Sequence, residues 1–279
     1  MNEVAETSGA PLLEARALTM RFGGVTALDA LDLVVHEHEI VGLLGPNGSG
    51  KTTFFNVVTG LYAASAGHVR FASADITRQS PQAVYRAGVT RTFQRSRLSL
   101  PLTVFDNVAL GQTAHLNPGL LFNLVNRAAL RRQFDETVAE VRGLLDTFRT
   151  GLSATLWQPA GALSMIDRRR VEVCRALISN PRLVLLDEPS AGMTHDETRE
   201  LMDDLLAARA RLSPFTIVLI EHEMGVIQRI TQRCVVLNHG KKIAQGSYAE
   251  ITADREVQIA YLGSDAPGPD PGHQLAEPT

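Results

Sequence analysis

A glycine-rich segment that ends in a lysine and two threonines carries the clearest chemical signal in this sequence. It follows an apolar run and consists of Gly45, Pro46, Asn47, Gly48, Ser49, Gly50, Lys51, Thr52 and Thr53. Its glycines let backbone N–H groups close around phosphates, the lysine reaches the β- and γ-phosphates, and the first threonine hydroxyl coordinates Mg²⁺. The alternative is a purely structural glycine loop, which the preceding strand and the following helix disfavour. The segment predicts a P-loop that binds a nucleotide with Mg²⁺.

Two adjacent acidic residues, Asp187 and Glu188, follow four apolar residues that are typical of a buried strand. Ligands of open α/β sheets bind at the carboxyl ends of such strands. Asp187 is suited to hold Mg²⁺ through water, whereas Glu188 can orient or deprotonate an attacking water. The alternative is a solvated acidic pair that begins a loop. Together with the P-loop, the pair favours a metal site and a catalytic base for nucleotide hydrolysis.

The pattern of the whole chain supplies elements that could position these residues. Residues 12 to 75 show strand-like runs around one helix that begins at the glycine loop, and residues 103 to 149 have apolar positions at helical spacing. Further helices are expected at 168–179, 196–211 and 248–262, with strands at LVLLD, at TIVLIEH and on both sides of a His-Gly turn. This order predicts an α/β P-loop core with a mostly parallel sheet, an antiparallel β subdomain and a helical subdomain inserted at about 95–165.

Composition excludes several other classes of protein. With 44% hydrophobic residues and a net charge of -3 over 279 residues, the chain has a globular composition and lacks the basic character of a nucleic-acid binder. No apolar run is long enough to span a bilayer and the N-terminus does not resemble a signal peptide, so we expect a cytosolic chain. Residues 1–11 and 264–279 are expected to be disordered tails around a domain at 12–263. Cys174 and Cys234 lack metal-ligand spacing and are expected to be buried and reduced.

Three further features complete a family pattern: Gln94 before the helical insertion, Leu163-Ser164 at its end, and His222 after a second apolar strand. In this order the chain resembles an ABC ATPase from about residue 12 to residue 263. Within that superfamily it is similar to the LivG-type subunits of branched-chain amino-acid importers, through the stretches RFGGVTAL, GPNGSGKTT, TRTFQRSRL, LDEPSAGM, LIEHEM and YLG.

The resemblance implies an ATP-hydrolysing subunit at the cytoplasmic face of the plasma membrane. Such a subunit closes with a second ABC ATPase subunit around two ATP molecules and drives transmembrane permease subunits. A solute-binding protein takes part indirectly, through the complex, and no nucleic acid is involved. The preference for ATP rests on the resemblance, because no segment of the sequence excludes GTP.

The resemblance also implies roles for single residues. Phe22 would stack on adenine, Gln94 would link Mg²⁺ to the transmembrane partner, His222 would be the switch histidine, and Ser164 would contact the ATP of the partner ATPase. Residues 95–101 would help to form a groove for a coupling helix of the permease. The alternatives are that Phe22 is an ordinary core residue at a strand end and that Gln94 and His222 are hydrogen-bonded polar residues without catalytic roles.

The segment that caps the partner's ATP departs from the family pattern. It reads Leu163-Ser164-Met165-Ile166-Asp167 instead of Leu-Ser-Gly-Gly-Gln or the subfamily form with Tyr-Gly-Gln. Ser164 and Asp167 predict a capping box, so the helix is retained, but Ile166 adds bulk where a glycine allows close approach. A carboxylate about 5 Å from a phosphate charge would be repelled by about 3 kcal/mol at an effective dielectric constant near 20.

We therefore expect two unequal ATP sites and a heterodimer whose second ATPase has a regular segment. Two other functions stay open: a soluble ABC-type clamp without a membrane partner, and a nucleotide-dependent binding subunit with weak hydrolysis. The triplet Arg168-Arg169-Arg170 could bind phosphate or lipid, but a solvated or salt-bridged helix face is the favoured interpretation.

Overall fold

The central element of the fold is a six-stranded sheet with strand order β10-β9-β3-β8-β7-β6. The computed structural model describes residues 10–94, 96–112, 127–149 and 151–262. Five strands run parallel and β10 runs antiparallel beside β9. The strands are β3 (Ile40–Leu44), β6 (Val89–Arg91), β7 (Leu183–Asp187), β8 (Thr216–Ile220), β9 (Arg233–Asn238) and β10 (Lys241–Gly246). Strands β3, β7 and β8 are buried along their whole length, as is usual in parallel sheets, and their residues are apolar except for the terminal Asp187 and Thr216.

A second, antiparallel sheet packs against one face of this core, with strand order β2-β1-β4-β5. Its strands are β1 (Pro11–Phe22), β2 (Val25–His36), β4 (Ala66–Phe71) and β5 (Ala74–Asp75). Alternate residues of β3 and β7 enter different hydrophobic clusters: Val41 and Leu43 pack with this second sheet, whereas Ile40 and Leu44 pack with the helices on the other face. The central sheet therefore separates two cores.

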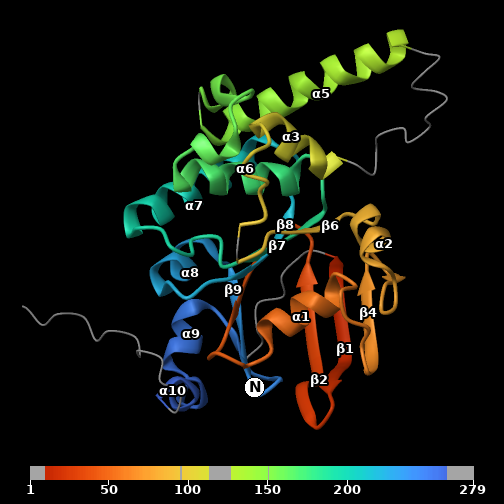
Figure 1. Ribbon diagram of the computed structural model, residues 1–279. Helices are drawn as coiled ribbons and strands as arrows, with labels where there is room; N and C mark the ends of the chain where they lie inside the picture. The colour runs from red at the N-terminus through yellow and green to blue at the C-terminus, as the bar shows by residue number, and fades with distance from the viewer. Residues whose placement is uncertain (1–9, 95, 113–126, 150, 263–279) are drawn as a thin grey trace, which may run out of the picture.

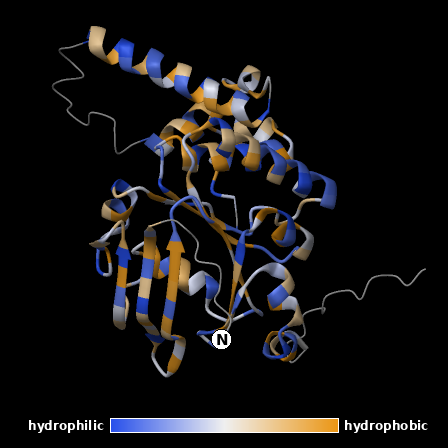
Figure 2. Cartoon of the chain, turned by 180° about the vertical axis from the view of Figure 1, so that it is seen from behind, coloured by the Kyte–Doolittle hydropathy of each residue, from blue (hydrophilic) through white to orange (hydrophobic). Residues whose placement is uncertain are grey.

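The longest helices gather at one end of the molecule, away from the antiparallel sheet (Figure 1). The helices are α1 (Lys51–Val58), α2 (Pro81–Arg86), α3 (Val104–Ala109), α5 (Arg127–Phe148), α6 (Met165–Leu177), α7 (His195–Arg211), α8 (Met224–Ile230), α9 (Tyr248–Ala253) and α10 (Arg255–Leu262), with short 3-10 helices at Leu110–Gln112, Leu152–Thr155 and Ala160–Ala162. In Figure 2 apolar and polar residues alternate along the long helices at this end, as expected where one face packs inward.

The predicted α/β architecture is confirmed, with local differences. Helix α6 begins at Met165, three residues before the predicted start, because Ser164 caps it. The predicted helix at 248–262 is two helices: Asp254 has extended backbone, and its carboxylate accepts the N–H groups of Glu256 and Val257, so it ends α9 and begins α10. Strand β1 starts at Pro11, inside the predicted tail.

Three predicted segments are not fully covered by the structure. Residues 1–9 of the predicted N-terminal tail, the whole predicted C-terminal tail at 264–279, and residues 95, 113–126 and 150 of the helical insertion lie outside the described residues. Cys174 and Cys234 are buried and form no disulfide, as predicted. Among the helices of the described ranges, none combines the length and the apolar composition that crossing a bilayer requires.

Candidate nucleotide-binding and hydrolysis site

The P-loop connects β3 to α1, and its backbone is shaped by two glycines that no other residue could replace without strain. Gly45 has φ 140° and Gly50 has φ 109°. An added Cβ would lie 2.1 Å from the Leu237 carbonyl oxygen at Gly45 and 2.6 Å from the Ala27 carbonyl oxygen at Gly50. Because Gly50 is the N-cap of α1, no side chain caps the first N–H groups of that helix. These N–H groups are therefore suited to bind phosphate oxygens.

Lys51 is buried inside the loop. Its Nζ donates to the carbonyl oxygens of Gly45 at 2.6 Å and Pro46 at 3.0 Å. Burial lowers the pKa of Lys51 below its ordinary value, against the opposing attraction of the Glu188 and Asp187 carboxylates. The carboxylates at the end of β7 therefore lie near enough to Lys51 to act on its charge.

Glu188 lies at the centre of that site and joins two residues that are remote in sequence. Gln94 Nε2 donates to its Oε2 at 2.5 Å, and His222 Nε2 lies 2.8 Å from its Oε1. Since a carboxylate only accepts hydrogen bonds, the proton in the second contact is on His222 Nε2. Glu188 has a positive φ of 47°, a conformation that is uncommon outside glycine and clusters at functional sites.

The parallel sheet explains why these residues meet. The P-loop follows β3, Gln94 follows β6, Glu188 follows β7 and His222 follows β8. All four strands are parallel, so their carboxyl ends lie along one edge of the sheet. The alternative of a solvated acidic pair is wrong for Asp187, whose side chain is only 5% exposed.

The oxygen donors beside the P-loop fit Mg²⁺. Thr52 supplies an exposed hydroxyl in the first turn of α1, and Asp187 and Gln94 supply a carboxylate and an amide. Among the described residues no three His, Cys, Asp or Glu side chains gather into a metal cluster. A site with few protein ligands suits Mg²⁺, which keeps several waters and shares phosphate oxygens of its nucleotide.

Phe22 ends β1 and is 43% exposed, so the alternative of an ordinary core residue is wrong. Its ring meets Tyr62 edge-on, with centroids 5.3 Å apart and an interplanar angle of 78°. An exposed aromatic face of this kind can stack on a nucleobase.

Sequence reasoning missed two residues that contact the site. Arg91 donates to Asp187 Oδ2 at 2.6 Å, and the Tyr261 hydroxyl accepts the N–H of Gly45 at 2.9 Å. Tyr261 belongs to the YLG stretch, which indicated the subfamily but gave no physical role for the tyrosine. Arg91 lies three residues before Gln94 in the TRTFQRSRL stretch, which likewise indicated the subfamily but no role for the arginine.

In the capping segment, residues 163–167, the contacts of Asp167 differ from those predicted. Ser164 Oγ accepts the N–H of Asp167 at 3.2 Å, but no reciprocal capping-box bond forms. Instead the Asp167 carboxylate accepts bonds from Ser164 Oγ at 2.9 Å, Arg170 at 2.7 Å and Arg149 at 3.1 Å. Although burial opposes it, hydrogen bonds from Arg170, Ser164 and Arg149 hold the pKa of Asp167 below its ordinary value. Its charge is therefore partly balanced within the chain, which reduces the repulsion expected for an isolated carboxylate.

Two members of the arginine triplet on α6, Arg169 and Arg170, are salt-bridged and buried, which agrees with the favoured interpretation of a salt-bridged face, whereas Arg168 donates to the Gly161 carbonyl oxygen. Arg170 is 1% exposed and contacts the carboxylates of Asp167, Glu200 and Asp204. Arg169 pairs with Glu172 and donates to the Gln94 and Ala191 carbonyl oxygens. These contacts connect α6 to the segment after β6.

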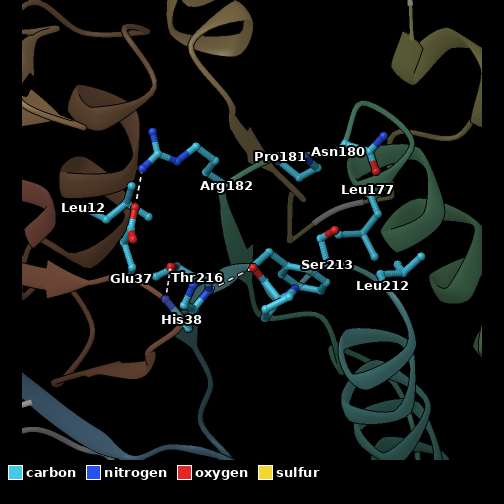
Figure 3. Close-up of a pocket in the computed structure, with 12 residues that line it drawn as sticks. Leu12, Glu37, His38, Leu177, Asn180, Pro181, Arg182, Leu212, Ser213 and Thr216 are labelled. Atoms are coloured by element: carbon cyan, nitrogen blue, oxygen red, sulfur yellow. Dashed lines mark hydrogen bonds and ion pairs between the residues drawn. The ribbon is translucent and has the colours of Figure 1, made fainter. Parts of the chain in front are cut away.

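A separate cavity of about 130 Å³ lies at the opposite edge of the sheet (Figure 3). Its polar groups are paired with each other: Arg182 with Glu37, and His38 Nδ1 with the Pro214 carbonyl oxygen at 2.9 Å. The cavity lies at the amino ends of β7 and β8, whereas the P-loop and the acidic pair lie at carboxyl ends. It is not part of the nucleotide site.

Comparisons with known proteins agree with this geometry. Residues 28–191 match the family described as ABC transporter, and residues 241–267 match the family described as branched-chain amino acid ATP-binding cassette transporter. The high-affinity branched-chain amino acid transport ATP-binding protein LivG of Salmonella typhimurium is 39% identical over 253 residues, which cover 91% of this chain and 98% of that protein. The corresponding protein BraF of Pseudomonas aeruginosa is 38% identical over 256 residues, with the same coverage.

Solved structures show the same relationship. A nucleotide-free ATP-binding cassette from an ABC transporter aligns with a TM-score of 0.78 and 28% identity, over 91% of this chain and 100% of that chain. An ATP-binding cassette in its ADP conformation aligns with the same score, identity and coverage. The chain therefore belongs to the ABC transporter ATP-binding family and is an ATPase subunit of the LivG type.

Proposed function

We propose that this chain binds and hydrolyses Mg-ATP at the cytoplasmic face of the plasma membrane and thereby drives an importer of branched-chain or other amino acids. The observation that carries the proposal is the meeting of Gln94, Glu188 and His222 beside the P-loop lysine. The names of the relatives support the substrate class, because LivG and BraF are described as branched-chain amino acid transport proteins.

Each residue of the site has a part in the proposed reaction. The P-loop N–H groups and Lys51 bind the phosphates, Phe22 stacks on adenine, and Thr52, Asp187 and Gln94 hold Mg²⁺. Bound Mg²⁺ neutralises charge on the β- and γ-phosphates. Glu188 accepts a proton from the attacking water, and His222, which donates to Glu188, positions the carboxylate.

The partners are permease subunits in the membrane, with a solute-binding protein acting through the complex. The experiment is to purify a tagged full-length chain from detergent-solubilised membranes and identify what accompanies it. We expect transmembrane permeases and a second ABC ATPase, and ATP-dependent uptake of leucine, isoleucine or valine when the complex is placed in proteoliposomes. Recovery of the chain alone, in the soluble fraction, would support a soluble clamp and contradict the proposal.

The second ATPase is proposed to be a different chain with a regular capping segment. In a nucleotide-sandwiching dimer this chain's capping segment would complete the partner's site. Met165 is 50% exposed at the start of α6, and Ile166 occupies the position where the subfamily has glycine. The Cβ of Ile166 opposes the close approach of backbone to phosphate that a glycine allows at this position. A homodimer would repeat this defect at both sites.

Changing Ile166→Gly and Asp167→Gln together is expected to raise the ATPase rate of the assembled transporter by roughly twofold, because a second site would become active. Ile166→Gly alone should give most of the gain, since it leaves the Asp167–Arg170 pair intact. Asp167→Gln alone should lower the free energy of unfolding by about 2 kcal/mol without a gain in rate. Equal turnover at both sites of the wild-type complex, with no gain in the variants, would contradict unequal sites.

A further inference from the structure

A groove of about 460 Å³ lies beside the nucleotide site, between α2, the edge strand β6 and α6. Its walls are mainly apolar and aromatic, and its cationic groups are arginines. The lining includes Leu61, Tyr85, Arg91, Phe93, Arg97 and Arg175. Arg97 belongs to the segment 95–101, for which we expected contact with a permease coupling helix. Arg97 is the residue of that segment that lines this groove, whereas Ser96, Leu98 and Leu100 line a smaller cavity of about 200 Å³.

Arg91 belongs both to the groove and to the nucleotide site. Its guanidinium donates to Asn56 Oδ1 on α1 at 2.6 Å and to Asp187 Oδ2 at the end of β7 at 2.6 Å. The Arg91 and Asp187 side chains are each 5% exposed. A buried ion pair of this geometry holds its carboxylate in a fixed orientation, because breaking it leaves an uncompensated buried charge.

The ring of Phe93 continues the contact from Arg91 toward the groove. The Arg91 guanidinium lies 4.9 Å from the centre of that ring, and the Arg97 guanidinium lies 4.4 Å from it. Arg97 also contacts α6, since its backbone N–H donates to Glu172 Oε1 at 2.9 Å. Contiguous contacts therefore run from Arg97 in the groove, through Phe93 and Arg91, to Asp187.

The contacts of Arg91 make the position of its guanidinium dependent on what occupies the groove. Its Nε atom is buried and has no hydrogen-bond partner among the described residues. An unpaired buried donor carries a free-energy cost that a rearrangement can relieve. The aromatic contacts, in turn, depend on where the Phe93 ring lies. Phe93 lines the groove, so an occupant of the groove would contact the ring against which the Arg91 guanidinium lies.

We propose that Arg91 is a positioning residue that couples occupation of the groove by the permease to the orientation of the Mg²⁺-binding carboxylate of Asp187. The proposal rests on the proposed function, because it takes the permease as the occupant of the groove. One oxygen of Asp187 is held by Arg91, and the other is left for Mg²⁺ and its waters. Docking of the permease then sets the position of that second oxygen, which changes the rate of hydrolysis more than the affinity for ATP.

The test uses Arg91→Lys, Phe93→Leu and the double variant in the complete transporter, reconstituted in proteoliposomes. Lysine keeps the charge, but its single ammonium cannot reproduce the planar fork that serves Asn56 and Asp187 together. Phe93→Leu keeps the ion pair and removes the ring. Arg182→Lys is the matched control, because Arg182 also pairs with a carboxylate and lies over a phenylalanine ring but lines the separate cavity of about 130 Å³ and not the groove. Permease-stimulated ATPase, KM for ATP and the melting temperature are measured for each.

We expect Arg91→Lys to lower the stimulated kcat about tenfold with KM for ATP within twofold of wild type, and Arg182→Lys to leave both unchanged. Phe93→Leu should lower stimulation in the wild-type background and have no further effect in the Arg91→Lys background, because the two residues act in series. Full stimulation of the ATPase by the permeases in both single variants, or additive losses in the double variant, would contradict the coupling through Phe93 and Arg91. If wild-type protein is not stimulated by the permeases at all, the proposed function fails instead.

Discussion

Replacing Glu188 by glutamine is expected to leave the affinity for ATP within about twofold of wild type and to slow hydrolysis by about 10²–10⁴-fold. The Glu188 carboxylate contacts Gln94 and His222 and makes no hydrogen bond to the P-loop backbone within the described part of the chain, so the phosphate-binding groups stay in place. The amide still fills the same space and can orient water, but it is a far poorer proton acceptor than a carboxylate. Binding and turnover should therefore separate.

The measurement is ATP binding by equilibrium titration and ATP hydrolysis in single-turnover mode, both with the assembled complex. Glu223→Gln serves as the control, because Glu223 is near His222 in sequence but pairs with the exposed His195. The control should hydrolyse ATP at the wild-type rate. A wild-type rate for Glu188→Gln would show that Glu188 is not the base, and a matching loss of ATP affinity would show that it contributes to binding.

Local patterns in the sequence were sufficient for the parts of the site that are contiguous in the chain. The P-loop and the pair Asp187-Glu188 could be predicted because each combines an apolar strand with chemistry at its carboxyl end. Gln94 and His222 have no local pattern of their own and were reached only through the family order. Their contacts with Glu188 depend on the neighbouring positions of β6, β7 and β8, which strand order in the sheet determines.

Residues whose roles come from tertiary contacts alone were the ones missed or misjudged. Arg91 meets Asp187 across two neighbouring strands, and Tyr261 reaches Gly45 from the last helix. For Asp167 the sequence indicated a charge but not its partners, because Arg149 lies at the end of another helix. The same limit applies to Asp254, where a carboxylate that caps α10 also ends α9, so one helical pattern conceals two helices.

Lys51→Ala is expected to weaken ATP binding by roughly 100-fold, because charge-assisted hydrogen bonds to phosphate each contribute about 1.5–3 kcal/mol. The ammonium is buried in the loop and faces the acidic pair, so water cannot easily replace it. Hydrolysis should fall at least as far, since the same charge stabilises the transition state of phosphoryl transfer. Titration with ATP in the presence of Mg²⁺ measures the loss directly.

Two further variants separate the charge of Lys51 from its packing. Lys51→Met fills nearly the same volume without charge, so it should lose affinity as much as Lys51→Ala while keeping a melting temperature closer to wild type. Lys241→Ala is the matched control, because Lys241 is an exposed lysine on β10 that pairs with Asp29. It should bind ATP like wild type. Unchanged ATP affinity in both Lys51 variants would contradict the P-loop assignment itself. In that case the N–H groups of the loop would hold the nucleotide without the buried ammonium between the loop and the acidic pair.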